Sequence, residues 1–199
     1  MRRLLLMITC PLLLLQVSRA QVPAATKEIF SPDFKWKLTI PDGFEPLSAE
    51  QVAQLQQNGK AAMEKSIDKK IENHTTSICA FKNGVANYFE ANQQPFDKKT
   101  DDDFLATCKA VDEVVYKTFK EQVAPGTQID TTYSKETIDG LEFERFEMKI
   151  NLGAAAKLNM LMYNRLFGDK EFTASIVYIE KEMGDLILTA WRKSRFEKK

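Results

Sequence analysis

The chain has 199 residues, its 28 lysines and arginines equal its 28 aspartates and glutamates in number, and 44% of its residues are hydrophobic. This apolar fraction and the thirteen phenylalanines exclude an intrinsically disordered protein. The balanced charge excludes the net basic face that nucleic-acid binding needs, so we expect a globular protein with a sizeable core and no nucleic-acid partner.

The first twenty residues have the pattern of a secretory signal peptide. Arg2 and Arg3 precede an apolar run over 4–15, and Ser18 and Ala20 supply the small residues of a cleavage site. The run is shorter than the roughly 20 residues of a membrane span, so the sequence predicts no stable membrane insertion. We expect cleavage near Ala20 and export, either to a periplasm or out of the cell.

After the signal peptide, residues 21–33 show no periodicity and are predicted to be a flexible leader. Apolar and polar residues then alternate over 34–40, which predicts a half-buried strand. Ser48 and Gln51 have the spacing of a capping box at the start of an amphipathic helix of about two dozen residues. Its predicted core stripe steps by three and four residues: Val52, Leu55, Gly59, Ala62, Met63, Ile67 and Ile71.

The middle of the chain predicts a hairpin and a second helix. Strands over 77–82 and 86–91 are joined at Asn83 and Gly84, a strong hairpin signal. The second helix is expected to begin near Asp101, where the helix dipole favours acidic residues. It is expected to bury Phe104, Cys108, Val111, Val115, Phe119 and Val123.

A second hairpin is predicted to turn at Asp139 and Gly140, between strands over 128–138 and 141–151. The second of these strands changes the phase of its apolar alternation part-way along. Because such a change requires an extra residue in a regular ladder, the sequence predicts a β-bulge near Glu144 and Arg145.

The third predicted hairpin pairs 158–167 with 172–179, and both segments are apolar on two faces. Such strands belong in the centre of a sheet that is covered on both sides. The final helix is expected to bury Met183, Leu186, Ile187, Ala190 and Trp191.

These elements predict one α+β domain over 34–199. Strands that occur in hairpins favour a mainly antiparallel sheet of six or seven strands, with the helices packed on its faces. The expected architecture is therefore an α/β/α sandwich.

The chain resembles the PsbP/Mog-like superfamily over most of residues 30 to 197. Residues 36–44 are similar to the opening strand and Pro-x-Gly-Phe turn of that family, and 173–178 with 194–196 to its closing strand and helix. The superfamily includes the PsbP subunit of photosystem II, the Ran-binding import factor Mog and many exported bacterial proteins of unknown role. The resemblance implies an α/β/α sandwich that usually binds or assembles other proteins rather than catalysing reactions. The signal peptide and the neutral-to-acidic charge argue against the Ran-binding branch.

Three residues are candidates for a groove that binds a partner or a small ligand. Arg165 lies on a strand with apolar neighbours on both faces, so it is paired inside the sandwich, at the rim of a groove or at the strand edge. A groove between the sheet and a helix is a common type of ligand site. The candidate groove residues are Tyr163, Arg165 and Trp191.

Cys79 and Cys108 remain after the predicted cleavage. An exported protein can join such a pair in a disulfide, and two small buried core residues are the alternative. His74 is the only histidine, so a catalytic Cys–His pair would need it together with Cys108. A cysteine on an apolar helix face favours an inert buried thiol instead.

The remaining motifs are weak. Asp97 and the acidic run over 101–103 lack the spaced oxygen ligands of a calcium loop, so we expect no metal site and no cofactor. Asn73 and Thr75 match an N-glycosylation acceptor, which is relevant only in a eukaryotic source.

The sequence therefore favours an exported, non-catalytic binding or assembly protein whose partner is a protein of the cell envelope or the exterior. The alternative is a carrier of a small apolar ligand or lipid in a cavity between sheet and helix, because methionine and phenylalanine side chains adapt to varied ligands. A Cys–His enzyme that uses His74 and Cys108 is the third hypothesis.

Overall fold

The computed structural model describes residues 28–99, 101, 103–153 and 156–197. The predicted signal peptide and the first part of the predicted leader lie outside these residues. The helices are α1 (Ala49–Ile67), α2 (Phe104–Gln122) and α3 (Lys181–Lys193). The strands are β1 (Glu28–Ser31), β2 (Trp36–Thr39), β3 (Glu45–Pro46), β4 (Thr76–Asn83), β5 (Asn87–Pro95), β6 (Ile129–Ile138), β7 (Leu141–Asn151), β8 (Lys157–Phe167), β9 (Lys170–Tyr178) and β10 (Arg195–Phe196).

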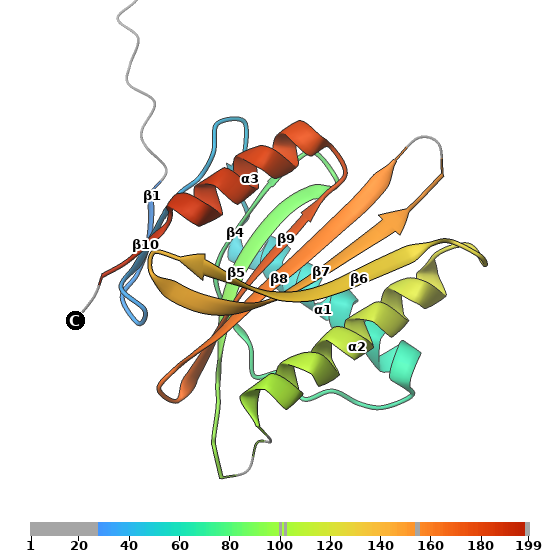
Figure 1. The fold of residues 1–199 in the computed structure, drawn as a ribbon, viewed down its shortest axis with the longest axis horizontal. Coiled ribbons are helices and arrows are strands. Elements are labelled where there is room, and N and C mark those ends of the chain that lie inside the picture. The colour runs from blue at the N-terminus through green and yellow to red at the C-terminus, as the bar shows by residue number, and fades with distance from the viewer. Residues whose placement is uncertain (1–27, 100, 102, 154–155, 198–199) are drawn as a thin grey trace, which may run out of the picture.

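Seven strands form one sheet in the order β3-β4-β5-β9-β8-β7-β6, and β1, β2 and β10 form a second, small sheet. Helix α3 and the small sheet cover one face of the large sheet, whereas α1 and α2 lie on the other face (Figure 1). This arrangement confirms the predicted α+β fold. Within the described residues, no helix is long and apolar enough to cross a membrane.

The three predicted hairpins are present as β4–β5, β6–β7 and β8–β9, all antiparallel. Strands β8 and β9 lie inside the sheet, between β7 and β5, as their two apolar faces predicted. The pairs of β8 and β9 run without interruption from Asn159–Tyr178 to Phe167–Lys170. The central strands therefore form a regular platform for the layers on both faces.

The predicted bulge near Glu144 and Arg145 is wrong, because β7 pairs in unbroken register with both β6 and β8. The apolar pattern shifts because the covering layer changes along the strand. Phe143 packs in the core under α3, whereas Phe146 and Met148 pack under α2 on the opposite face. The observed irregularity lies elsewhere, between Ser77 and Cys79 of β4.

Strand β1 occupies a segment that was predicted to be leader. Its four residues pair with β2, from Glu28 opposite Thr39 to Ser31 opposite Trp36. Only this pairing defines the strand, because the segment has no apolar alternation of its own. Ser31 is nevertheless buried, so β1 closes the outer edge of the small sheet.

Helix α1 begins with the predicted capping box, in which Gln51 N–H donates to Ser48 Oγ and Ser48 N–H donates to Gln51 Oε1. The helix ends earlier than predicted, because Asp68 takes a left-handed conformation with φ of 50°. Ile71 N–H then donates to the carboxylate of Glu64, which fixes the chain as it leaves the helix.

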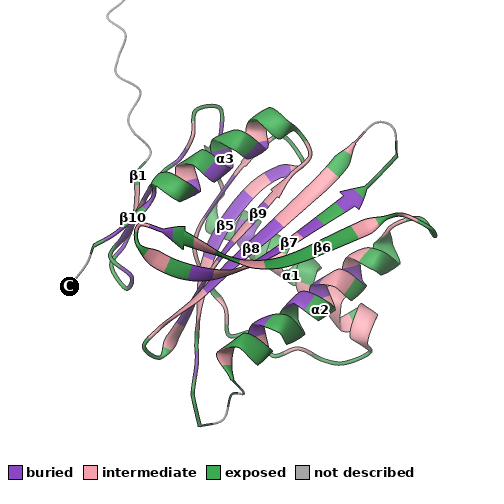
Figure 2. Ribbon diagram, in the orientation of Figure 1, coloured by how far each residue is buried: buried purple, intermediate pink, exposed green. Residues whose placement is uncertain are grey.

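A dense aromatic core lies between α3, the small sheet and the large sheet. The indole ring of Trp191 lies 5.3 Å from the rings of Phe143 and Tyr163 and 6.1 Å from that of Phe172, measured between ring centroids. Trp36 of the small sheet contacts the same group from the other side. Figure 2 shows that buried residues concentrate on the central strands and on the inner sides of the helices.

Gly184 allows α3 to lie close to β9. A Cβ atom placed at this position would lie only 2.3 Å from Cδ2 and 2.5 Å from Cγ of Tyr178. We expect Gly184→Ala to lower the free energy of unfolding by about 1–3 kcal/mol, because the ring or the helix must move. Gly59→Ala is the matched control, because nothing lies within 4 Å of its added Cβ. The control is expected to raise stability by about 0.5–1 kcal/mol, and urea unfolding of both variants tests the prediction.

Candidate functional site

The structure brings two of the three predicted groove residues, Tyr163 and Trp191, together inside a packed core, and places Arg165 outside that core. Tyr163 and Trp191 are 0% exposed and contact each other. The guanidinium of Arg165 lies over the ring of Phe167, and it donates to the backbone carbonyl oxygen of Glu142. A ligand could therefore reach only Arg165 of the three.

Tyr163 belongs to an ionic network under α3. Its hydroxyl donates to Glu136 Oε2 over 2.9 Å, and Arg192 of α3 donates to Glu136 Oε1 over 2.7 Å. Burial acts to raise the pKa of Glu136, but the hydrogen bonds from Arg192 and Tyr163 outweigh it and lower this pKa. Because the network ties α3 to β6 and β8, its role is structural.

Both described cysteines are free thiols. Cys79 packs against the aromatic core, and Cys108 lies on α2 at the opposite face of the sheet. Burial raises the pKa of Cys79 to about 12 and raises that of Cys108 as well, so both thiols are protonated at neutral pH. The His74 side chain is 66% exposed and pairs with Glu72 at 3.5 Å, and His74 is not among the residues that line the cleft beside Cys108.

The face of the sheet that carries α1 and α2 is polar at one end and apolar at the other. The apolar end, with Phe146, Met148, Ile150 and Met162, packs against α2 near Val115. At the other end, paired positions on six neighbouring strands form a continuous line of polar side chains, which we call the polar row. Its members are Lys135, Glu144, Asn164, Thr173, Asn92 and Ser77.

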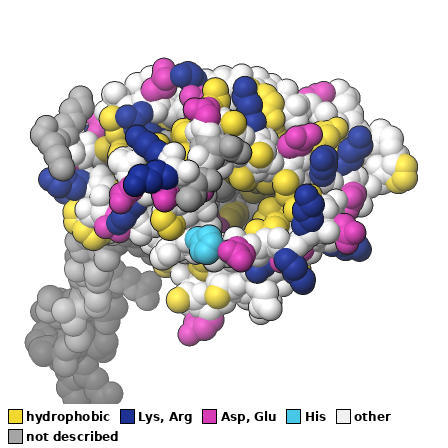
Figure 3. All heavy atoms as spheres, turned by 90° about the horizontal axis from the view of Figure 1, so that it is seen from below, with side chains coloured by type: hydrophobic (Ala, Val, Ile, Leu, Met, Phe, Trp, Pro, Cys, Tyr) yellow, Lys and Arg dark blue, Asp and Glu magenta, His cyan; other side chains and the backbone are white. Residues whose placement is uncertain are grey.

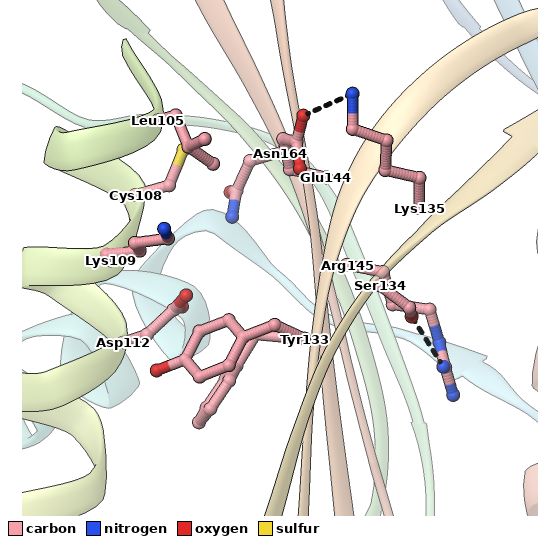
Figure 4. Close-up of a pocket in the computed structure, with 11 residues that line it drawn as sticks. Leu105, Cys108, Lys109, Asp112, Tyr133, Ser134, Lys135, Glu144, Arg145 and Asn164 are labelled. Atoms are coloured by element: carbon pink, nitrogen blue, oxygen red, sulfur yellow. Dashed lines mark hydrogen bonds and ion pairs between the residues drawn. The ribbon is translucent and has the colours of Figure 1, made fainter. Parts of the chain in front are cut away.

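A cleft of about 240 Å³ lies between the N-terminal half of α2 and the end of the sheet that holds the polar row. We call it the α2 cleft. Figure 4 shows Asp112, Cys108 and Lys109 reaching from α2 towards the strands, and Asn164 reaching back towards the helix. The lining residues are Leu105, Cys108, Lys109, Asp112, Tyr133, Ser134, Lys135, Glu144, Arg145, Phe146 and Asn164.

Asp112 is the unusual residue of the α2 cleft. Its side chain is buried, with only 3% of the residue exposed, and its Oδ1 atom has no hydrogen-bond partner. Burial, and next the charge of Glu171, raise the pKa of Asp112 to about 7. A buried carboxyl without a hydrogen-bond partner lowers the free energy of unfolding. Stability therefore does not explain an aspartate at this position.

Further carboxyl groups surround the same place. Glu171 of β9 is buried and accepts a hydrogen bond from Gln94 over 2.6 Å. Burial raises the pKa of Glu171. Burial also raises the pKa of Cys108, and the charges of Glu171, Asp112 and Glu144 raise it further. Among the charged residues that line the α2 cleft, Asp112 and Glu144 are acidic and Lys109, Lys135 and Arg145 are basic.

The charged groups of opposite sign are held by other partners or lie in solvent. Lys135 pairs with Glu142 at 2.7 Å and with Glu144 at 3.3 Å. Arg145 donates to Glu147 over 2.8 Å and also to Ser134, on the α3 side of the sheet. Lys109 is exposed, and within the described part of the chain Asp112 forms no salt bridge with Lys109, Lys135 or Arg145, the basic side chains of the cleft lining.

A second hollow of about 290 Å³ lies between α1 and β4, lined among others by Val52, Ala53, Gln56, Ile78 and Ala80. Figure 3 views the molecule from the side of α1 and α2. It shows this face hollowed near its centre, with hydrophobic side chains inside and charged side chains of both signs around them. The second hollow lacks a buried group without a partner, as far as the described residues show. The α2 cleft is therefore the better candidate for recognition.

No protein-family model matches the sequence, and a search of curated proteins gives no match. Among solved structures, the chain is similar to cyanobacterial PsbP (CyanoP) from Synechocystis sp. PCC 6803, with 12% identity and a TM-score of 0.53. The alignment covers 90% of this chain and 98% of that one. The fold is PsbP-like.

A second solved structure, from Bacteroides thetaiotaomicron VPI-5482, aligns with 9% identity and a TM-score of 0.47. That alignment covers 87% of this chain and 49% of the other. At this TM-score the second likeness adds nothing to the fold assignment.

On the PsbP-like fold, the sequence pattern missed the residue that distinguishes the α2 cleft. The predicted stripe of the second helix contained Val111, which is 41% exposed, and omitted Asp112, which is buried. The stripe matched Cys108 and Val115 correctly. A signal was present, because Asp112 lies four residues after Cys108 and three before Val115, the spacing of one helix face.

Proposed function

We propose that the chain is an exported, non-catalytic binding or assembly protein of PsbP/Mog-like type, and that it contacts a protein partner through the α2 cleft. The observation that carries this proposal is the buried, unpartnered Oδ1 of Asp112 in an open cleft. Such a group is costly in the free protein and is compensated when a partner supplies a hydrogen-bond donor. The predicted signal peptide supports the exported location.

The rim of the α2 cleft also favours a protein partner. Tyr133 is 53% exposed and Leu105 is 39% exposed, and both line the cleft. Tyrosine is enriched at the energetically important centres of protein interfaces, since it adds apolar area and a polar group together. Leu105 and Tyr133 beside the buried carboxyl of Asp112 offer apolar and polar contacts to a protruding partner side chain.

The carrier of an apolar ligand is less well supported. The α2 cleft and the second hollow measure about 240 and 290 Å³, below the range of about 300–1,000 Å³ that small-molecule pockets occupy. The core under α3 is closed by interlocking aromatic rings. A lipid would have to displace those rings.

The test is affinity purification of the tagged full chain from its native envelope after mild cross-linking. We expect one stoichiometric protein partner, and at least about 30-fold weaker binding when Leu105→Ala and Tyr133→Ala remove the rim. Val85→Ala is the matched control, because Val85 is fully exposed in the β4–β5 turn, outside the cleft lining. Absence of any stoichiometric partner, or equal capture by the rim variant, would contradict the proposal.

A further inference from the structure

We infer that the α2 cleft is a receptor for a single basic side chain, a lysine or arginine of the partner, whose N–H donates to Asp112 Oδ1. This inference deepens the proposed function and rests on it. It assigns the chemistry of the occupant, which the fold likeness leaves open.

The first argument is the hydrogen-bond inventory of the cleft floor. Asp112 lines the cleft and only 3% of its surface is exposed. No group donates a hydrogen bond to its Oδ1 atom. Asn164 is oriented by Thr173, whose hydroxyl donates to Asn164 Oδ1 over 2.9 Å. The cleft therefore lacks a donor at Asp112, and an ammonium or guanidinium group carries several donors on one rigid head.

The second argument is charge. Asp112 lines the cleft, and the buried carboxyl of Glu171 lies near enough for its charge to raise the pKa of Asp112. The basic groups of the sheet that line the cleft are paired with other carboxylates, Lys135 with Glu142 and Glu144 and Arg145 with Glu147, so Asp112 keeps its charge uncompensated. Lys109 of α2 also lines the cleft, but it is exposed, so salt screens its repulsion of an incoming cation.

The third argument is size and shape. A volume of about 240 Å³ suits one side chain better than a larger ligand. The rim residues Leu105 and Tyr133 lie where the aliphatic stem of lysine or arginine would pass. Long basic side chains bury this stem against apolar surface while the charged head makes polar contacts, and an aromatic ring such as that of Tyr133 attracts a cation.

A metal ion fits the cleft less well than an organic cation. Among the described residues, no group of three or more histidine, cysteine, aspartate and glutamate side chains is arranged to hold a metal. Calcium takes six to eight oxygen ligands, whereas a lysine ammonium needs only a few acceptors. Calcium chloride therefore serves as a competitor in the test.

The experiment is an NMR titration of the full chain at pH 8 with Nα-acetyl-lysine-N-methylamide, followed through backbone amide shifts. We expect saturable shifts at Cys108, Asp112 and Asn164. The uncharged norleucine analogue, which has the same stem, is expected to bind at least tenfold more weakly. Equal binding of the two analogues, or displacement of lysine by stoichiometric calcium, would overturn the inference.

The matched variants are Asp112→Asn, which keeps the shape and removes the charge, and Glu113→Gln on the exposed side of the same helix. Asp112→Asn is expected to weaken lysine binding at least tenfold, and Glu113→Gln to leave it unchanged. Lys109→Met, which removes the nearest like charge, is expected to strengthen it. If Asp112→Asn binds lysine as wild type does, the inference fails, whatever the affinity purification shows.

A last comparison identifies the source of the cation. n-Butylammonium carries the same head without a peptide backbone, and we expect it to bind more weakly than blocked lysine because it cannot contact the rim. Equal affinities would overturn the assignment to a protein side chain in favour of a free amine. Lysine binding by a chain with no stoichiometric partner would leave the cleft chemistry supported and the proposed function contradicted, so the two failures are distinguishable.

Discussion

Replacing Trp191 by alanine is expected to lower the free energy of unfolding by about 3–5 kcal/mol, the usual cost of removing a fully buried large aromatic side chain. Trp191 is 0% exposed and its ring contacts six other aromatic rings, those of Trp36, Phe89, Phe143, Tyr163, Phe172 and Phe196. A domain is stable by only about 5–15 kcal/mol. The melting temperature should therefore fall by roughly 10 °C, measured by circular dichroism.

Two variants separate this packing effect from a general weakness of α3. Leu186→Ala on the exposed side of the helix is expected to cost less than about 1 kcal/mol. Trp191→Phe is expected to cost less than half as much as Trp191→Ala, because the indole Nε1 is buried without a partner and its removal offsets part of the lost packing. Equal losses for Leu186→Ala and Trp191→Ala would show that the aromatic core does not centre on Trp191.

The helices and the three hairpins of this fold were predictable because each has a local signal. The turns at Asn83 and Asp139, the capping box at Ser48 and the apolar faces of the third hairpin depend only on nearby residues. β1 was missed because its definition depends on pairing with β2 rather than on its own pattern. Interactions between nearby residues therefore predict the helices and hairpins better than they predict the strands at the sheet edges.

The errors at β7 and α2 have different physical causes. Each face of β7 is covered at one end only, by α3 near Phe143 and by α2 near Met148, so its apolar pattern switches without a bulge. On α2 the apolar pattern favoured Val111 over Asp112 as a buried position. Burying a carboxyl is costly, so aspartate is rarely found in protein cores. The switch along β7 depends on how the layers overlap, which a sequence window does not contain, whereas the position of Asp112 was indicated by its spacing from Cys108 and Val115.

The pH dependence of stability provides a second large effect at Asp112. Its pKa is raised to about 7 in the folded chain by burial and by the charge of Glu171, against 3.8 for an ordinary exposed aspartate. Between these values the folded state keeps a proton that the unfolded state has released. The free energy of unfolding therefore falls as pH rises from about 4 to about 7 and stays low above that. Burial also raises the pKa of Glu171. Some dependence of the unfolding free energy on pH therefore remains when Asp112 is replaced.

Asp112→Asn is therefore expected to stabilise the chain at pH 8 by about 2–4 kcal/mol and to change little at pH 4, where the wild-type carboxyl is already neutral. Urea unfolding at both pH values measures this difference. Glu113→Gln, one residue along on the solvent side, is expected to follow wild type. Parallel pH profiles for Asp112→Asn and wild type would mean that the buried carboxyl is compensated in the free chain.

The same measurement connects stability with recognition. A gain on neutralising Asp112 would show that the chain retains a group that opposes its own folding at neutral pH, as binding sites often do. A ligand that binds only the folded state raises stability by mass action. Blocked lysine should then stabilise wild type at pH 8 more than at pH 6, with about tenfold tighter binding at pH 8, because a carboxyl of pKa about 7 is mostly ionised there. Asp112→Asn should show neither effect. That result would show that the same carboxyl group both lowers the stability of the free chain and binds the basic side chain.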